Sequence, residues 1–176
     1  MPLDKNTLQQ ALRDLFNGTT PYPASAAAAG STWAQIFATY AKTAHAAETA
    51  PIAAAADAQA TVLGGALGSA FVAAQAAGPN YLTPLLPQLV SAFSAFWPPV
   101  GFLAPGVVGV ATSPPPAGLT ASLTSFFTAG NPPSGPRPSG NDQADSMASL
   151  LDAWTRTVAV INTPAGLPPR PPVFLT

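Results

Sequence analysis

A run of 79 consecutive uncharged residues constrains this chain more than any other feature. No Asp, Glu, Lys or Arg lies between Asp57 and Arg137. General acid–base catalysis needs ionisable side chains, so this run is not expected to host such chemistry. Over all 176 residues only 7% are charged, against about 25% in an average soluble domain. Because a soluble monomer keeps a mixed charged surface, we expect neighbouring polypeptides or lipid to cover much of the exterior.

The remaining composition argues against several functional classes. Six basic and seven acidic residues give a net charge of −1, which predicts no surface for nucleic-acid phosphates. The chain has no cysteine, and His45 is its single histidine. We interpret His45 as an exposed neighbour of Glu48, because a metal site needs more ligands. No Gly-x-Ser-x-Gly turn is present. We therefore expect no cofactor and no enzymatic activity.

Hydrophobic spacing predicts a mainly α chain of helical hairpins with long Pro-rich loops. Leu8, Leu12 and Leu15 share one face of a first helix, which Asn6 or Thr7 can cap. Asn141 or Asp142 is the expected cap of the last helix. The expected helices span about residues 7–16, 24–47, 52–77, 84–97, 118–127 and 142–160.

Three segments are expected outside the helices. Residues 100–116 form a Pro- and Gly-rich excursion in which residues 107–110 fit a short strand. Residues 129–140 form a flexible linker. The tail, residues 163–176, is expected to be an extended Pro-rich arm outside the core, which leaves residues 1–162 as a single helical domain.

The two ends of the helical domain resemble each other. Leu8, Leu12, Leu15 and Phe16 match Leu119, Leu123, Phe126 and Phe127 at a constant offset of 111. At an offset of 114, Trp33, Ile36, Phe37 and Tyr40 match Met147, Leu150, Leu151 and Trp154. One interpretation is an internal duplication, with repeats at 6–47 and 117–160 and a bridging segment at 48–116. The alternative is that any two amphipathic helices can be aligned in this way.

Gly64 and Gly68 lie four residues apart in the third expected helix. This spacing brings two small residues onto one helix face and allows a second helix to approach closely. We interpret the pair as a tight packing face in a water-soluble fold. Dimerisation of membrane helices is the alternative.

Several apolar residues are candidates for contact with a partner. The aromatic residues in the middle of the uncharged run are either core or an exposed patch. The tail fits either a groove of the SH3 type or an arm laid across a neighbouring subunit. The candidate contact residues are Phe93, Phe96, Trp97, Phe102, Val107, Val108, Pro168, Pro169, Arg170, Pro171, Pro172 and Phe174.

Four features together resemble the small Ala- and Pro-rich structural proteins of tailed bacteriophages and phage-like contractile particles. They are the amphipathic opening at residues 3–16, the Ala-rich second helix with Trp33 and Tyr40, the excursion Gly101-Phe102-Leu103-Ala104-Pro105-Gly106-Val107-Val108-Gly109, and the closing Asp152-Ala153-Trp154-Thr155-Arg156-Thr157. The resemblance implies a virion component of the tail, baseplate or neck, assembled in the cytoplasm of a bacterial host. It implies no catalytic residues.

The function predicted from these features is a non-enzymatic structural subunit that contacts other protein subunits. The alternative is a small membrane-associated helical protein, with residues 60–77 and 82–102 as an uncharged hairpin. Gln75 and four prolines weigh against that hairpin, because neither segment is a continuous apolar span of about 20 residues.

Overall fold

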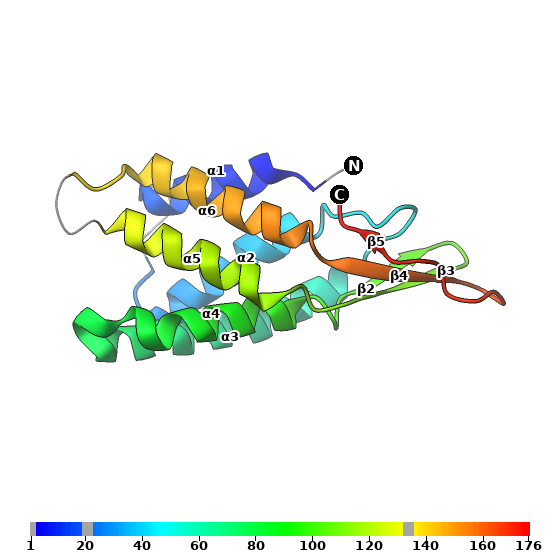
Figure 1. Cartoon of the computed structure of the whole chain (residues 1–176), viewed down its shortest axis with the longest axis horizontal. Coiled ribbons are helices and arrows are strands. Elements are labelled where there is room, and N and C mark those ends of the chain that lie inside the picture. Colours follow the sequence, from blue (N-terminus) through cyan, green and yellow to red (C-terminus); the bar gives the residue numbers. More distant parts are fainter. Residues whose placement is uncertain (1–2, 19–22, 132–135) are drawn as a thin grey trace.

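The computed structural model describes residues 3–18, 23–131 and 136–176. Within these ranges, six α-helices run along a common axis and a curled five-stranded antiparallel sheet lies at one end of them (Figure 1). The helices are α1 (Lys5–Phe16), α2 (Ala26–Ala41), α3 (Ala53–Ala77), α4 (Leu82–Phe96), α5 (Pro116–Gly130) and α6 (Gly140–Thr155). The strands are β1 (Ala50–Pro51), β2 (Gly101–Ala104), β3 (Val107–Ala111), β4 (Ala159–Pro164) and β5 (Val173–Phe174).

The mainly α prediction is confirmed in part: six helices are present in the described residues, but the five-stranded sheet was not predicted. Helix α3 lies within one residue of its expected bounds. The predicted caps are wrong by a few residues. The Asp4 carboxylate accepts hydrogen bonds from the Asn6 and Thr7 amides and caps α1. Ser139 caps α6, and Asp142 completes a capping box. Residues 19–22 of the connector before α2 and residues 132–135 of the predicted linker lie outside the described ranges.

Two helices end earlier than their alanine content or periodicity predicts. α2 stops at Ala41 because the following turn is fixed by the sheet: the Asn162 side chain donates to the Ala46 carbonyl over 2.9 Å and accepts from the Thr49 hydroxyl over 3.0 Å. α6 stops at Thr155, and the β-branched residues that follow enter β4. Long-range contacts therefore override intrinsic helix propensity at the end of α2, whereas at the end of α6 the β-branched sequence itself favours a strand.

Helices α2 and α3 make the most extensive contact between any two elements. A methyl group built on Gly30 of α2 would lie 2.3 Å from the backbone nitrogen of Gly68 and 2.5 Å from the backbone oxygen of Gly64. The two backbones therefore touch directly. This contact confirms that Gly64 and Gly68 form a tight packing face. The helix that packs on them is α2 of the same chain, not a helix of a second copy.

The centre of the core is an aromatic cluster around Phe37 of α2. Its ring lies 5.0 Å from that of Phe93 and 5.1 Å from that of Phe96, both edge to face, and 6.1 Å from that of Trp97. Trp97 in turn stacks on Phe102 of β2. Edge-to-face pairs of this kind stabilise a core beyond simple burial of area.

The sheet has the strand order β1-β2-β3-β4-β5, and all neighbours are antiparallel. A strand at residues 107–110 was predicted and is confirmed as part of β3. No second strand was predicted in the rest of the excursion. Instead, Gly101–Ala104 pairs with β3 as a hairpin.

The predicted arm at residues 163–176 is wrong at both of its ends. Residues 163 and 164 belong to β4, and Val173–Phe174 forms β5. Leu175 is 2% exposed, and the Thr176 backbone exchanges two hydrogen bonds with the His45 backbone. Only residues 165–172, between the two strands, are exposed as a Pro-rich loop. Paired β-branched and aromatic residues outweigh the prolines here, because prolines disfavour only the positions where a ladder amide is needed.

Candidate functional site

The outer face of the sheet is an exposed apolar surface. Residues directly opposite each other in an antiparallel sheet point to the same side, as do alternate residues along a strand. The register therefore places nine residues on this face, all uncharged: Ala50, Gly101, Leu103, Val108, Val110, Ala159, Ile161, Thr163 and Phe174. We call this set the outer sheet face.

The large side chains of the outer sheet face are unusually exposed. Leu103 is 48% exposed, Val108 54%, Val110 57% and Phe174 61%. The opposite side of the same strands is buried, with Phe102, Val160 and Asn162 at 2% exposure or less. The sheet thus carries apolar residues on both sides, although one side faces solvent in the isolated chain. Contiguous exposed apolar surface of this kind marks interaction sites.

The structure divides the predicted contact residues into two groups. Phe93, Phe96, Trp97 and Phe102 are at most 2% exposed, so their prediction as partner contacts is wrong. They are buried because the chain itself supplies their aromatic neighbours. Val107 faces the inner side of β3, half-buried.

The second group is exposed at the sheet end of the molecule. Val108 and Phe174 lie on the outer sheet face, and residues 168–172 lie in the exposed loop beside it. Arg170 holds this loop against the sheet through an ion pair with Glu48 and a backbone hydrogen bond to the Asn162 carbonyl. Glu48 therefore pairs with Arg170 and not with His45 as predicted.

Sequence reasoning did not select Leu103, Val110 or Leu167, which are also exposed. The signal for Val110 was present in the alternation of β3, whereas Leu103 lies on β2. The inward positions of β3 are Val107, Gly109 and Ala111, and its outward positions are Val108 and Val110. Large residues on one side of a strand normally mark the buried side, so the sequence pattern indicated the wrong face.

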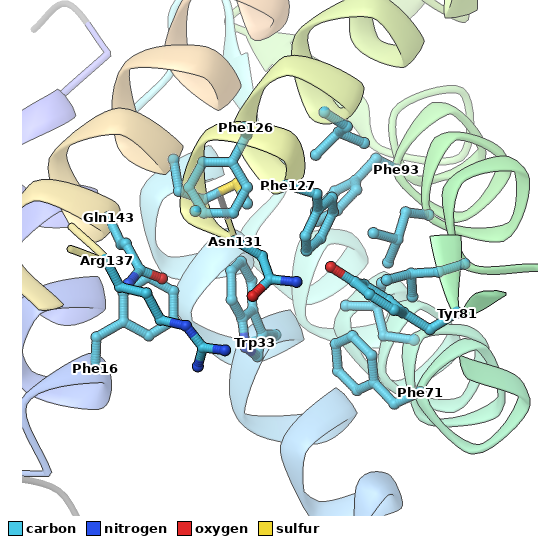
Figure 2. A pocket seen from close by; sticks show the side chains of 16 residues that line it. Phe16, Trp33, Phe71, Tyr81, Phe93, Phe126, Phe127, Asn131, Arg137 and Gln143 are labelled. Carbon is cyan, nitrogen blue, oxygen red and sulfur yellow. The ribbon is translucent and has the colours of Figure 1, made fainter. Parts of the chain in front are cut away.

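A pocket of about 540 Å³ lies at the end of the helices opposite the sheet. It lies where α1 and α5 end and where α4 and α6 begin, and Figure 2 shows sixteen side chains around it. Most are apolar, including Trp33, Phe71, Phe93 and the two adjacent phenylalanines at the end of α5. The polar side chains around it are Tyr81, Asn131, Arg137 and Gln143. Volumes of about 300–1,000 Å³ are typical of small-molecule sites.

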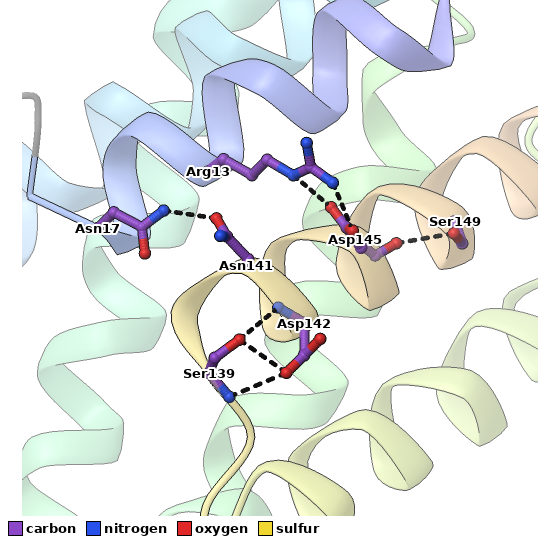
Figure 3. A network of polar contacts seen from close by, with 7 residues as sticks. All are labelled: Arg13, Asn17, Ser139, Asn141, Asp142, Asp145 and Ser149. Carbon is purple, nitrogen blue, oxygen red and sulfur yellow. Dashed lines mark hydrogen bonds and ion pairs between the residues drawn. The ribbon is translucent and has the colours of Figure 1, made fainter.

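A polar network fixes the start of α6 beside this pocket (Figure 3). Arg13 donates two hydrogen bonds of 2.7 Å to the Asp145 carboxylate and so joins α1 to α6. The Asn17 amide donates to the Asn141 side chain over 2.6 Å. The capping box of Ser139 and Asp142 completes the network. Together these contacts hold the first turns of α6, which carry Gln143.

We expect Asp145→Asn to lower stability near neutral pH but not in acid. The hydrogen bond from Arg13 lowers the pKa of the Asp145 carboxyl in the folded chain. The pair therefore stabilises the fold above the pKa of an unfolded Asp, about 3.9. That contribution is lost as pH falls through the lower pKa of the folded state. The thermal midpoints of wild type and Asp145→Asn, measured from about pH 7 to about pH 2, should become equal at the lowest pH. A difference independent of pH would contradict this assignment.

Comparison with known proteins does not supply an identity. No family model matches the sequence, and no match is found among curated proteins or solved structures. Within residues 3–18, 23–131 and 136–176, no group of three or more His, Asp or Glu side chains is placed to hold a metal ion.

Proposed function

We propose that this chain is a non-enzymatic structural subunit of a multi-subunit assembly, and that the outer sheet face contacts another polypeptide. The observation that carries the proposal is the exposure of Leu103, Val108, Val110 and Phe174 on one uncharged face. Burying such area against a neighbour contributes about 25 cal/mol per Å². The low charge of the whole chain supports the same conclusion. Few of its side chains are charged, so little strongly hydrated surface has to be desolvated when a neighbour binds.

The same proposal extends to the setting of the assembly. The resemblance to Ala- and Pro-rich phage proteins supports a bacteriophage virion component in the tail, baseplate or neck, assembled in the bacterial cytoplasm. Its partners would be other protein subunits, whether copies of this chain or different chains. Detection of the chain in purified particles is the direct test, and its absence from particles made by the same host would contradict the virion setting.

We expect Val110→Lys to disrupt association and Val62→Lys to leave it unchanged. Both valines are exposed, at 57% and 63%, but Val110 lies within the outer sheet face whereas Val62 lies on α3. A buried lysine without a partner at an interface costs several kcal/mol. Sedimentation velocity should show wild type and Val62→Lys as species larger than the 17.7 kDa monomer, and Val110→Lys as the monomer. Where the neighbour is a different chain, co-purification with particles replaces self-association as the readout.

The result that contradicts the proposal is a wild-type chain that stays monomeric at high concentration and is also absent from particles. Equal behaviour of the two lysine variants would contradict the role of the outer sheet face specifically. Circular dichroism spectra of both variants should match that of wild type, because each substitution is at an exposed position.

A membrane-associated helical protein is the second candidate. The segment Ala53–Asn80 is long and apolar enough to cross a membrane, with a mean hydropathy of 1.4 in its best window, of which 33% is buried in the fold. Core helices of soluble proteins also satisfy this criterion. The second half of the predicted membrane hairpin is not one helix, because α4 ends at Phe96 and β2 begins at Gly101. Flotation of the chain with lipid vesicles would favour this candidate over the first.

We also propose that the pairs α1–α2 and α5–α6 are helical hairpins derived from one ancestral unit. Two of the matched pairs have equal burial: Leu8 and Leu119 are both 0% exposed, and Phe37 and Leu151 are both 1% exposed. Superposing the two pairs at offsets of 111 and 114 should align the matched Cα atoms. Pairs that superpose only in another register would contradict the duplication.

A further inference from the structure

The pocket at the end opposite the sheet has a floor suited to an apolar group. Its depth is lined by aromatic and aliphatic side chains from α2, α3, α4 and α5, which offer water few hydrogen-bonding partners. Water is held in a cavity only where two to four polar groups can bind it. An apolar molecule would therefore gain by displacing solvent from this floor.

The opening of the pocket has the opposite character. The Asn131 amide and the Tyr81 hydroxyl face one another there, and the Arg137 guanidinium extends into the same region (Figure 2). Arg137 is exposed, and of the four ion pairs that the described residues form none includes it. Arg13, Arg156 and Arg170 each pair with a carboxylate of the chain. A guanidinium left without a carboxylate at the edge of an apolar pocket is a site for the anionic head of a ligand.

We propose that this pocket binds an amphipathic monocarboxylate, with its apolar body among the aromatic rings and its carboxylate at Arg137. Asn131 would donate a second hydrogen bond to the same carboxylate. One guanidinium balances one negative charge, which favours a carboxylate over a doubly charged phosphate head. The site is separate from the outer sheet face, since it lies at the other end of the helices.

Dodecanoate, kept below its micelle concentration, is the probe that tests this assignment. Isothermal titration should show saturable binding to the full chain, and Arg137→Gln should weaken it about tenfold, because a charge-assisted hydrogen bond is lost. Dodecyltrimethylammonium has the same tail and the opposite head charge, and it should bind wild type more weakly than dodecanoate does. Arg170→Gln is the matched control, since that arginine lies at the sheet end, and it should leave the affinity unchanged.

Quenching of tryptophan fluorescence shows where the hydrocarbon chain of the bound dodecanoate lies. Trp33 lines the pocket, whereas Trp97 and Trp154 are at most 5% exposed and do not line it. A dodecanoate brominated at the end of its tail should quench Trp33 by contact. With this dodecanoate present in saturating amounts, Trp33→Phe should abolish most of the quenching, because the indole that the bromine contacts is gone.

Three results would overturn the proposal: no binding of dodecanoate, equal affinity in wild type and Arg137→Gln, or quenching that persists in Trp33→Phe. The last would place the tail elsewhere, for example on the outer sheet face. Because Arg137 is exposed, its glutamine variant is expected to fold, so a loss of affinity reports on the site itself.

Discussion

Gly30→Ala should destabilise the protein by about 3 kcal/mol or more, although alanine is the better helix former. The added methyl group would lie 2.3 Å and 2.7 Å from the backbone nitrogen and Cα of Gly68. Neither neighbour is a side chain that can rotate away, so α2 and α3 would have to separate. Separation would in turn loosen the packing of Phe37 against α4. Urea denaturation followed by circular dichroism gives the free energy of unfolding directly.

Gly65→Ala is the matched control. Gly65 is adjacent to Gly64 on α3, but a methyl group built on it meets nothing within 4 Å. Here the helix propensity of alanine should act alone and stabilise the chain by about 1 kcal/mol. Opposite signs for Gly30→Ala and Gly65→Ala are therefore expected. A Gly30→Ala protein with the same free energy of unfolding as wild type would contradict the close approach of α2 and α3.

The helices could be predicted because their signals are local. Apolar spacing and alanine content indicate α1 and α3 within a few residues, and the Gly64 and Gly68 spacing indicates close packing before any partner helix is known. The end of α2 could not be predicted in this way. Ala44 and Ala46 favour helix, but the Asn162 side chain, far along the chain, fixes that segment as a turn.

Most of the sheet was missed for the same reason. β1 and β5 contain two residues each, and β2 contains four, which is too short for a periodic pattern. The pairing of β1 joins residues as far apart as Ala50 and Leu103, which β-propensity does not encode. β3 and β4 each contain three β-branched residues, but only β3 was predicted as a strand, because the last helix was expected to run to about residue 160.

The candidate sites show a similar division. Val108 and Phe174 were selected because they are large apolar residues in Pro-rich surroundings, and they are exposed. The same reasoning wrongly selected Phe96 and Trp97, because sequence alone does not reveal that Phe37 covers them. Arg137 was visible only as the charge that ends the uncharged run. Its position at a pocket depends on how the ends of four helices meet.

Gly109→Ala in the centre of the sheet should cost about 3 kcal/mol, whereas Val110→Thr, one residue further along β3, should change stability by less than about 1 kcal/mol. A methyl group on Gly109 would lie 2.5 Å from the Asn162 side-chain oxygen and 2.8 Å from Cβ of Phe102. It would displace the amide that holds the Ala46 turn. Val110 points the other way, so threonine keeps its β-branched shape and exposes a hydroxyl to water.

Comparing Gly109→Ala with Val110→Thr shows which side of the sheet contributes to the stability of the isolated chain. Urea unfolding of Asn162→Ala and of Gly109→Ala combined with Asn162→Ala completes a double-mutant cycle, and the combined loss should be smaller than the sum of the single losses, because one substitution makes room for the other. A small effect of Val110→Thr on folding together with a large effect of Val110→Lys on association would separate the two roles of β3. Gly109 would then serve the fold, and Val110 would be retained for a neighbour. A large loss of stability in Val110→Thr at concentrations where the chain is monomeric would instead place the outer sheet face inside the fold and remove the basis of the assembly proposal.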